Sequence, residues 1–357
     1  ASTSKPILPV QVTVTNDSNQ TTETYSVDPT NVTFSSIPDG SETLPQSAYV
    51  EWTKYNYNDQ GQMEWLRSYH NIPASGEGEI ATNYYQTTYA YDAQGQKILI
   101  TAPTGAKTYT VYDQQGRTIE TWVGTDATGA TQSNPAGEGT NNLKKIAATF
   151  YDEATIGGGT SGVGDGYATS TRSYHGSGAN DYVKTMYHYD YRGRLRGTDS
   201  QGHDGSNWQT IAPVSVQDVD NMGRSTAAAE YTAAPTWSTV LTDADYAATI
   251  ATNRRALSET LYDEKGQAYR SVVHEIDPSD GSDDGSMATN YWYDAAGRTI
   301  KVKDPAGLFS KTVYDGAGRA TESYVCHDDD ETAYADADDT DGDTILRVTV
   351  NVYVNDR

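Results

Sequence analysis

The clearest pattern in the sequence is an alternation of side chains with period two. Tyrosines recur two residues apart, as at Tyr89 and Tyr91 and again at Tyr291 and Tyr293. Residues on one face of a β-strand have this spacing. The segment Thr299–Lys303 alternates in the same way just before a Pro-x-Gly turn. The pattern therefore predicts short strands joined by tight turns, with tyrosines in rows on a sheet face.

A six-residue string, Tyr-Asp-x-x-Gly-Arg, marks the ends of these strands and recurs along the chain. Full matches begin at Tyr112, Tyr189, Tyr293 and Tyr314. Matches that differ at one or two positions begin at Tyr57, Tyr91, Val219 and Tyr262. Two further positions, Tyr151 and Tyr353, keep the strand but lose the short turn. We call each of these strings a hinge.

The residue types of the hinge suit a β-hairpin turn. The tyrosine closes a strand, and the aspartate that follows can accept hydrogen bonds from backbone N–H groups two and three residues further on. The glycine three residues after the aspartate tolerates the positive φ that ends such a turn. Arg or Gln then opens the return strand, where an Arg can lie across from the Asp. An exposed pair of this kind adds at most about 1 kcal/mol.

The hinges themselves belong to a longer repeat. Tyr91 and Tyr293 are 202 residues apart (293 − 91), and the pairs Tyr112 with Tyr314 and Tyr151 with Tyr353 have the same separation. The chain therefore holds about one and a half copies of a block of roughly 200 residues. Because the sequence stops inside the second copy at Arg357, we expect excision from a longer precursor.

Residues 1–48 differ from the repeat region, residues 49–357. They contain one Tyr and no hinge, and after Pro9 they alternate cleanly at Val10, Val12 and Val14. One interpretation is an added edge strand that caps the repeat sheet. The other is a donor strand, Val10–Val14, that pairs with the sheet of another copy of the chain, since an open sheet edge accepts an extra strand.

Composition supports an all-β fold: consecutive hairpins forming a curled or spiralling antiparallel sheet, with an N-terminal β-strand segment. The 357 residues include 28 Tyr, 3 Phe and 32 Gly, and only 36% are hydrophobic. Tyr, Thr and Val suit a half-buried pleated surface, and Gly supplies turns. The net charge of -24 repels phosphate groups, which argues against nucleic acid and anionic membranes as partners.

Other features indicate an exported chain without a structural zinc site. Cys326 is the single cysteine, so an intrachain disulfide and a zinc site of the cysteine type are excluded. No stretch approaches the roughly 20 apolar residues of a membrane span. Ala1 in place of an initiator Met fits a chain whose signal peptide has been removed, and we expect an extracellular or cell-surface location.

Candidate catalytic and binding residues give weak signals. The acidic run from Asp328 to Asp343 can hold calcium, but an EF-hand loop anchored on Gly342 needs a ligand at Ala337, so a solvated loop is favoured. The six His residues are scattered without a nucleophile motif, which favours plain surface or strand positions. The segment Gly157–Gly162 lacks the Lys-Ser/Thr ending of a phosphate loop. We predict no enzyme activity, no catalytic or metal residues and no cofactor.

Six tryptophans and the many tyrosines raise a further possibility. Aromatic rings can stack on sugars, but contacts between aromatic side chains on neighbouring strands explain these residues with fewer assumptions. The tryptophans are Trp52, Trp65, Trp122, Trp208, Trp237 and Trp292.

The recurring hinges resemble the YD repeats of the rearrangement-hotspot (RHS) family, which are similar to repeats in insecticidal toxin-complex proteins and teneurins. The resemblance covers residues 51–357. It implies long β-hairpins joined side by side into a spiralling sheet, which in some relatives closes into a shell around a toxin. This chain lacks the core segment that marks shell closure and self-cleavage, and it has no toxin segment, so we expect an open or partly curled sheet.

These observations favour a non-catalytic, extracellular structural repeat protein that assembles with copies of itself into a surface fibre or sheath. Two alternatives remain open at this point. The chain can be a fragment of a toxin-enclosing RHS shell, or a module that binds glycans or a cell surface.

Overall fold

A computed structural model describes residues 9–28, 44–152, 166–327, 337 and 339–353. The chain divides into two compact units, residues 1–149 with 172–181 and residues 150–171 with 182–357. The described part of the chain contains 21 strands and two short α-helices, so the predicted all-β class is confirmed.

The strands of the first unit follow one another closely. They are β1 (Val10–Thr15), β2 (Thr21–Val27), β3 (Tyr49–Tyr57), β4 (Met63–Tyr69), β5 (Tyr84–Tyr91), β6 (Lys97–Thr101), β7 (Lys107–Tyr112) and β8 (Thr118–Gly124). A 3₁₀ helix, Gln46–Ala48, precedes β3. Two strands, β9 (Lys144–Tyr151) and β10 (Ala168–Tyr174), contribute residues to both units.

The second unit continues the same arrangement. Its strands are β11 (Tyr182–Tyr189), β12 (Leu195–His203), β13 (Trp208–Val219), β14 (Ser225–Tyr231), β15 (Arg254–Tyr262), β16 (Ala268–Ile276), β17 (Asp283–Tyr293), β18 (Thr299–Lys303), β19 (Phe309–Tyr314), β20 (Ala320–His327) and β21 (Thr344–Val350). The helices α1 (Trp237–Thr242) and α2 (Tyr246–Thr249) lie between β14 and β15 in the sequence.

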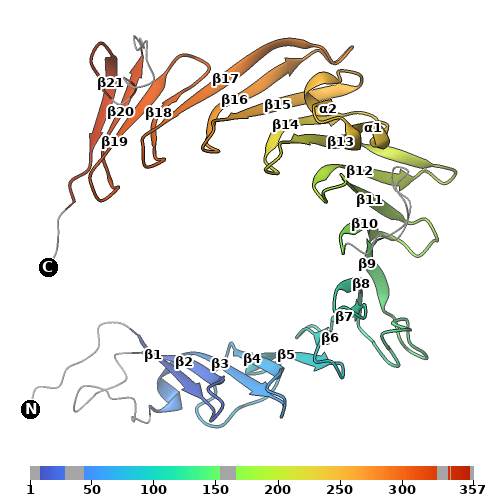
Figure 1. The fold of residues 1–357 in the computed structure, drawn as a ribbon. Coiled ribbons are helices and arrows are strands. Elements are labelled where there is room, and N and C mark those ends of the chain that lie inside the picture. Colours follow the sequence, from blue (N-terminus) through green and yellow to red (C-terminus); the bar gives the residue numbers. More distant parts are fainter. Residues whose placement is uncertain (1–8, 29–43, 153–165, 328–336, 338, 354–357) are drawn as a thin grey trace, which may run out of the picture. The chain divides into compact units, whose positions relative to one another are not determined.

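Within each unit, every strand pairs antiparallel with the strand that follows it, as β2 does with β3 and β19 with β20. Strands that are neighbours in sequence accordingly lie side by side in Figure 1. A register shift of one residue follows most hinges. Val111 pairs with Glu120 and Tyr112 with Thr118, which leaves Ile119 as an extra residue. Such a β-bulge increases the local twist of the hairpin.

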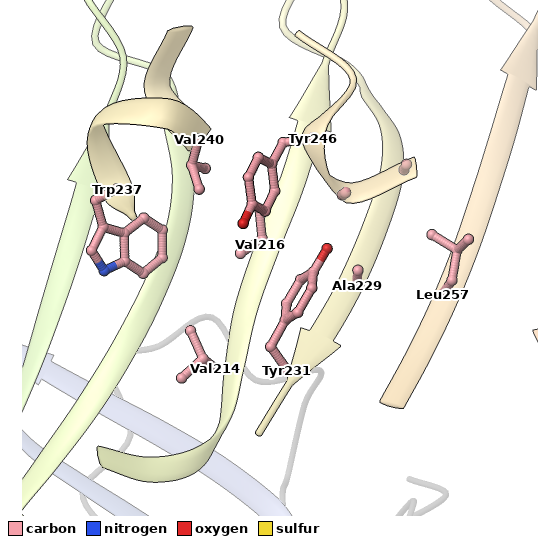
Figure 2. Close-up of a cluster of buried hydrophobic side chains, with 10 residues drawn as sticks. Val214, Val216, Ala229, Tyr231, Trp237, Val240, Tyr246 and Leu257 are labelled. Carbon is pink, nitrogen blue, oxygen red and sulfur yellow. The ribbon is translucent and has the colours of Figure 1, made fainter. Parts of the chain in front are cut away.

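The apolar interior is divided into small clusters. The largest belongs to the second unit, where α1 and α2 cover one face of β13–β15 (Figure 2). Trp237, Val240 and Tyr246 from the helices pack on Val216 and Tyr231 from the strands. In the first unit, one small cluster surrounds Val27 and Ala48, and another is built from Tyr109, Val111 and Leu143. Thin cores of this kind leave much of the sheet's cohesion to polar contacts.

Aromatic side chains form a row across neighbouring strands of the first unit. The rings of Tyr25 and Tyr49 stack with centroids 4.1 Å apart, and those of Trp52 and Tyr69 stack at 3.8 Å. Tyr69 also lies 5.2 Å from Tyr84. The expected cross-strand aromatic contacts are therefore present here, and they leave Trp52 only 5% exposed.

The N-terminal strand is part of the first unit. Val10, Val12 and Val14 in β1 pair with Val27, Tyr25 and Glu23 in β2. Among the described residues, β1 pairs antiparallel with β2. Its pairing with another copy of the chain stays a prediction.

Buried polar residues anchor the helical cover of the second unit. Arg196 and Asp218 are about 2% and 1% exposed, and Arg196 Nη2 donates to Asp218 Oδ1 over 2.9 Å. Asp218 also accepts hydrogen bonds from the backbone N–H groups of Ala247 and Ala248 at the start of α2. One carboxylate therefore joins β13, β12 and the helix.

We predict that Asp218→Asn destabilises the second unit by about 3 kcal/mol, because it leaves the buried Arg196 cation without its counter-ion. Urea unfolding measures this change. Asp220→Asn is the matched control, because Asp220 also pairs with an arginine but lies in an exposed hinge. Equal unfolding midpoints for Asp218→Asn and the wild type would contradict the role given to this pair.

Candidate functional site

The hinges form the most extensive recurring polar structure in the protein. In the hinge at Tyr112, the N–H of Asp113 donates to the carbonyl of Arg117, and the N–H of Gly116 donates to the carbonyl of Asp113. Gly116 has φ of +82°, the left-handed conformation that favours glycine. The turn is a type I turn closed by a left-handed glycine, as the sequence predicts.

The aspartate of the hinge organises the turn in a slightly different way from the prediction. Asp113 Oδ1 accepts hydrogen bonds from the N–H groups of Gln115 and Arg117, which are two and four residues further on, not two and three. The left-handed glycine explains the difference, because it redirects the chain so that the N–H after it faces the carboxylate. The same two bonds recur at Asp92, Asp190, Asp220, Asp294 and Asp315.

These contacts stabilise the ionised carboxylates. At Asp220, Asp294 and Asp315 the pKa is lowered, chiefly by the hydrogen bond from the backbone N–H four residues on. The arginine side chain at that position adds to the effect. Arg224 Nε lies 2.7 Å from Asp220 Oδ2, so the expected Asp–Arg pairing within the hinge is confirmed.

A neutral version of the hinge appears where the charged pair is replaced by amides. Asn58 Nδ2 donates to Gln62 Oε1 over 2.9 Å, and Asn16 Nδ2 donates to Gln20 Oε1 over 3.0 Å. The hinge at Asn16 has Asn19 with φ of +59° in the glycine position. The sequence analysis missed this hinge because it lacks the tyrosine, the glycine and the arginine. Asn16 and Asn19 nevertheless stand at the aspartate and glycine positions of the hinge, where Asn favours such a turn.

The tyrosine that opens each hinge makes a contact between hairpins. In eight hinges of the described chain, its hydroxyl donates to the backbone carbonyl of the first residue in the return strand of the preceding hairpin. The pairs, with O···O distances in Å, are Tyr57 to Thr21 (2.9), Tyr91 to Met63 (2.9), Tyr112 to Lys97 (2.9), Tyr189 to Ala168 (3.2), Tyr262 to Ser225 (3.1), Tyr293 to Ala268 (2.7), Tyr314 to Thr299 (3.0) and Tyr353 to Ala320 (2.9). We call this series the tyrosine ladder.

The residue after the hinge glycine reaches in the opposite direction, toward the next hinge. Gln62 Nε2 donates to the carbonyl of Gly95 over 3.1 Å, and Gln267 Nε2 does the same to Gly297 over 3.2 Å. A Cβ atom at Gly95 would lie only 2.9 Å from Gln62 Nε2 and would displace the tip of that side chain, while the φ of +83° at Gly95 favours glycine by itself.

Where this residue is Arg224 or Arg298, its guanidinium stacks on the tyrosine of the next hinge. Arg224 lies 4.3 Å from the ring centroid of Tyr262, and Arg298 lies 4.6 Å from that of Tyr314. Cation–π contacts at exposed sites contribute about 0.5–1 kcal/mol. Tyr262 and Tyr314 are thus held through both the hydroxyl and the ring.

The hinge at Val219 has no tyrosine, and another residue replaces the missing bond. The carbonyl that a tyrosine would reach belongs to Leu195, the first residue of β12. Gln217 Nε2 donates to this carbonyl over 2.7 Å. The ladder bond is therefore conserved in function across a hinge that lacks the usual side chain.

Two histidines make defined contacts that the sequence did not indicate. His188, 2% exposed, has Nε2 2.6 Å from Asp199 Oδ1, and its ring stacks on Trp237 at 3.5 Å. Burial lowers the pKa of His188, and Asp199 opposes this shift. His274 uses both ring nitrogens, toward Glu259 and toward Asp283. It therefore links three strands and has no free nitrogen for proton transfer.

The acidic segment is described only in part, because residues 328–336 and 338 lie outside the described residues. Asp343 departs from the expectation of a solvated loop: its side chain is fully buried, and its Oδ2 lies 2.7 Å from Lys311 Nζ. Lys311 also donates to the carbonyl of Asp339. The predicted glycine-rich segment Gly157–Gly162 lies outside the described residues as well.

Among the described residues, no helix is long and apolar enough to cross a membrane. No group of three or more His, Cys, Asp or Glu side chains gathers in that part of the chain as a metal site would require.

Comparisons with known proteins gave matches only among solved structures; no family model and no curated protein matches. The Photorhabdus luminescens Tc holotoxin pore carrying a TccC3 mutation is 15% identical with a TM-score of 0.42, over 79% of this chain and 14% of that chain. The TcdB2–TccC3–Cdc42 structure is 13% identical with a TM-score of 0.41, over 89% and 18%.

A porin-like protein from Bacteroides uniformis is 10% identical with a TM-score of 0.23, over 77% of this chain and 88% of that chain. This chain spans less than a fifth of the length of the toxin chains it matches. Likeness at this level assigns no activity and no partner to this chain.

We predict that Tyr314→Phe lowers the free energy of unfolding by about 1 kcal/mol, because the Thr299 carbonyl loses its hydrogen bond while the ring stays under Arg298. Tyr269→Phe is the control, since the described residues give the Tyr269 hydroxyl no hydrogen-bond partner and its side chain is 39% exposed. If both variants unfolded at the same urea concentration, the hydrogen bond of Tyr314 would make no contribution to stability.

We predict that the second unit loses stability as pH falls below 6.5. Burial holds the pKa of His188 in the fold below its ordinary value of about 6.5, so the unfolded chain takes up a proton first. The contribution of the neutral His188 to stability is fully present above pH 6.5. Below that pH, the free energy of unfolding falls by at most about 1.4 kcal/mol per pH unit. Urea unfolding from pH 7.5 to 5.5 should give a flatter profile for His188→Gln than for the wild type, and parallel profiles would refute the assignment.

Proposed function

We propose that this chain is a non-catalytic structural segment whose hairpin sheet forms part of the wall of an exported assembly. The observation that supports the proposal is the tyrosine ladder, which joins successive hairpins at their hinge ends. A hydrogen bond of this kind contributes about 1 kcal/mol, so a series of them stiffens the sheet without a thick core.

Several features favour this role over catalysis. Both ring nitrogens of His274 are engaged within the sheet, by Glu259 and by Asp283. The buried ion pairs, such as Arg196 with Asp218, join strands and helices. Side chains that are fully engaged in this way hold a scaffold together and have little freedom to bind and release a substrate.

We infer an extracellular or cell-surface location from the net charge, the single cysteine and the resemblance of the hinges to RHS repeats. The net charge of -24 keeps copies soluble through mutual repulsion, and the single cysteine, Cys326, is buried and free. The resemblance of the hinges to RHS repeats leads to the same location. It also leaves a toxin-enclosing shell as the alternative assembly, to which this chain would contribute a section of wall.

The tyrosines needed for the ladder supply the test. We predict that the triple variant Tyr262→Phe, Tyr293→Phe and Tyr314→Phe loses about 3 kcal/mol of stability in total and fails to build ordered material outside the cells that make it. Immunogold electron microscopy should place the wild type on fibres, sheaths or shells.

The control for this experiment replaces three exposed tyrosines that are not in the ladder, Tyr85, Tyr191 and Tyr269, with Phe. It should build the same material as the wild type. Gold particles confined to the cell interior would contradict the proposed structural role. Normal assemblies from the triple ladder variant would contradict it as well.

A further inference from the structure

The face of the sheet opposite α1 and α2 carries small side chains. Val216, Ala229 and Leu257 belong to the buried cluster beneath the helices (Figure 2). Because side chains alternate along a strand, the residues beside them in sequence point to the other face. On β13, β14 and β15 these neighbours include Ser215, Ala228, Ala256 and Ser258, all of them exposed.

These small side chains form the floor of a pocket of about 350 Å³ within the second unit. The strand register places them side by side, since Ala228 pairs with Ser258 on the neighbouring strand. Larger side chains flank the floor on the outermost strands of the lining, Leu195 on β12 and Val273 on β16. Sites for small molecules have volumes of about 300–1,000 Å³, so this pocket has room for a ligand of one ring and a short chain.

The lining of the pocket is mainly apolar, with methyl groups of Ala228, Ala256 and Val273 among the contacts that it offers. Gln217 also lies in the lining, but its Nε2 already donates to the Leu195 carbonyl. A ligand gains free energy here chiefly by removing its own apolar surface from water. The body of a matching ligand is therefore apolar.

Glu230 gives the pocket its charge. Among the residues that line the pocket, all of which the structure describes, it is the one ionisable side chain. It is exposed, and the register places it on β14 between Ser215 and Ala256. Within the described chain its carboxylate has no hydrogen bond or ion pair, whereas Asp220 binds Arg224. Glu230 is therefore available to a cation outside the chain.

We propose that this pocket binds an organic cation with an apolar body, such as an amine attached through a short chain to an aromatic ring. The ring lies on the floor of small residues, and the ammonium group pairs with Glu230. Because the chain has a net charge of -24, it attracts cations and repels anions, and added salt weakens the attraction. This binding goes beyond the structural role and does not depend on it.

Three probes with the same ring and chain separate the effect of charge from that of apolar contact. Phenylbutylamine is cationic, phenylbutanol neutral and phenylbutanoate anionic. Saturation-transfer NMR titrations should show that the wild type binds the amine about fivefold more tightly than the alcohol, as an exposed ion pair allows. The carboxylate should bind most weakly, and added salt should weaken the binding of the amine and not that of the alcohol.

Two substitutions test the two parts of the site. Glu230→Gln should reduce the affinity for the amine to that for the alcohol and leave the alcohol unchanged. Ala228→Leu fills the floor and should abolish the binding of all three probes. The matched controls are Glu264→Gln and Ala233→Leu, at exposed positions outside the lining, and both should bind like the wild type.

Several results would overturn the proposal. Equal affinities of the wild type for amine and alcohol would remove the role of Glu230, and binding unaffected by Ala228→Leu would place the probes elsewhere. A dimer in sedimentation velocity that Ala228→Leu dissociates would show that a second copy occupies the pocket instead. Urea unfolding checks that each variant folds, and Ser258→Leu, which fills the same floor, replaces Ala228→Leu if that variant does not.

Discussion

The hydrogen bond from a hinge tyrosine to the carbonyl of the preceding hairpin is the interaction on which the rest of the structure depends. Within a hairpin, the turn already holds two strands together. Between hairpins, no turn joins the strands at the hinge end, so strand pairing there depends on side-chain contacts. The tyrosine hydroxyl closes that gap at the hinge end, as Tyr91 does with Met63 and Tyr293 with Ala268. A sheet with thin, divided cores needs this lateral bond because little apolar area is buried behind it.

This requirement explains part of the composition. A phenylalanine fills the same space as a tyrosine but cannot donate a hydrogen bond, which accounts for the tyrosine at the eight hinge positions of the ladder. The hinge at Val219 supports the explanation, because Gln217 reaches the Leu195 carbonyl where the tyrosine is missing. The acidic and basic residues of the hinge act locally instead. Arg224, for example, binds the Asp220 beside it and stacks on Tyr262 in the next hinge.

The sequence was sufficient to predict the hairpin fold, since the Asp-x-x-Gly string determines the turn from neighbouring residues alone. It could not reveal the ladder, because the residues that meet are 15 apart at Tyr112 and 37 apart at Tyr262, depending on the intervening strands and insertions. It could not reveal the burial of Asp343 or His188 either. In both cases a partner from another strand, Lys311 or Asp199, makes a buried polar group tolerable, and that partner is set by the fold.

The tyrosine ladder also gives the sheet a direction. In a hinge with a tyrosine, such as that at Tyr91 or Tyr293, the hydroxyl bonds back to the preceding hairpin, whereas Gln62 and Gln267 bond forward to the next hinge. The first described hinge sends Gln20 forward to the Gly61 carbonyl, but Thr15 occupies its tyrosine position and has no phenol to send back.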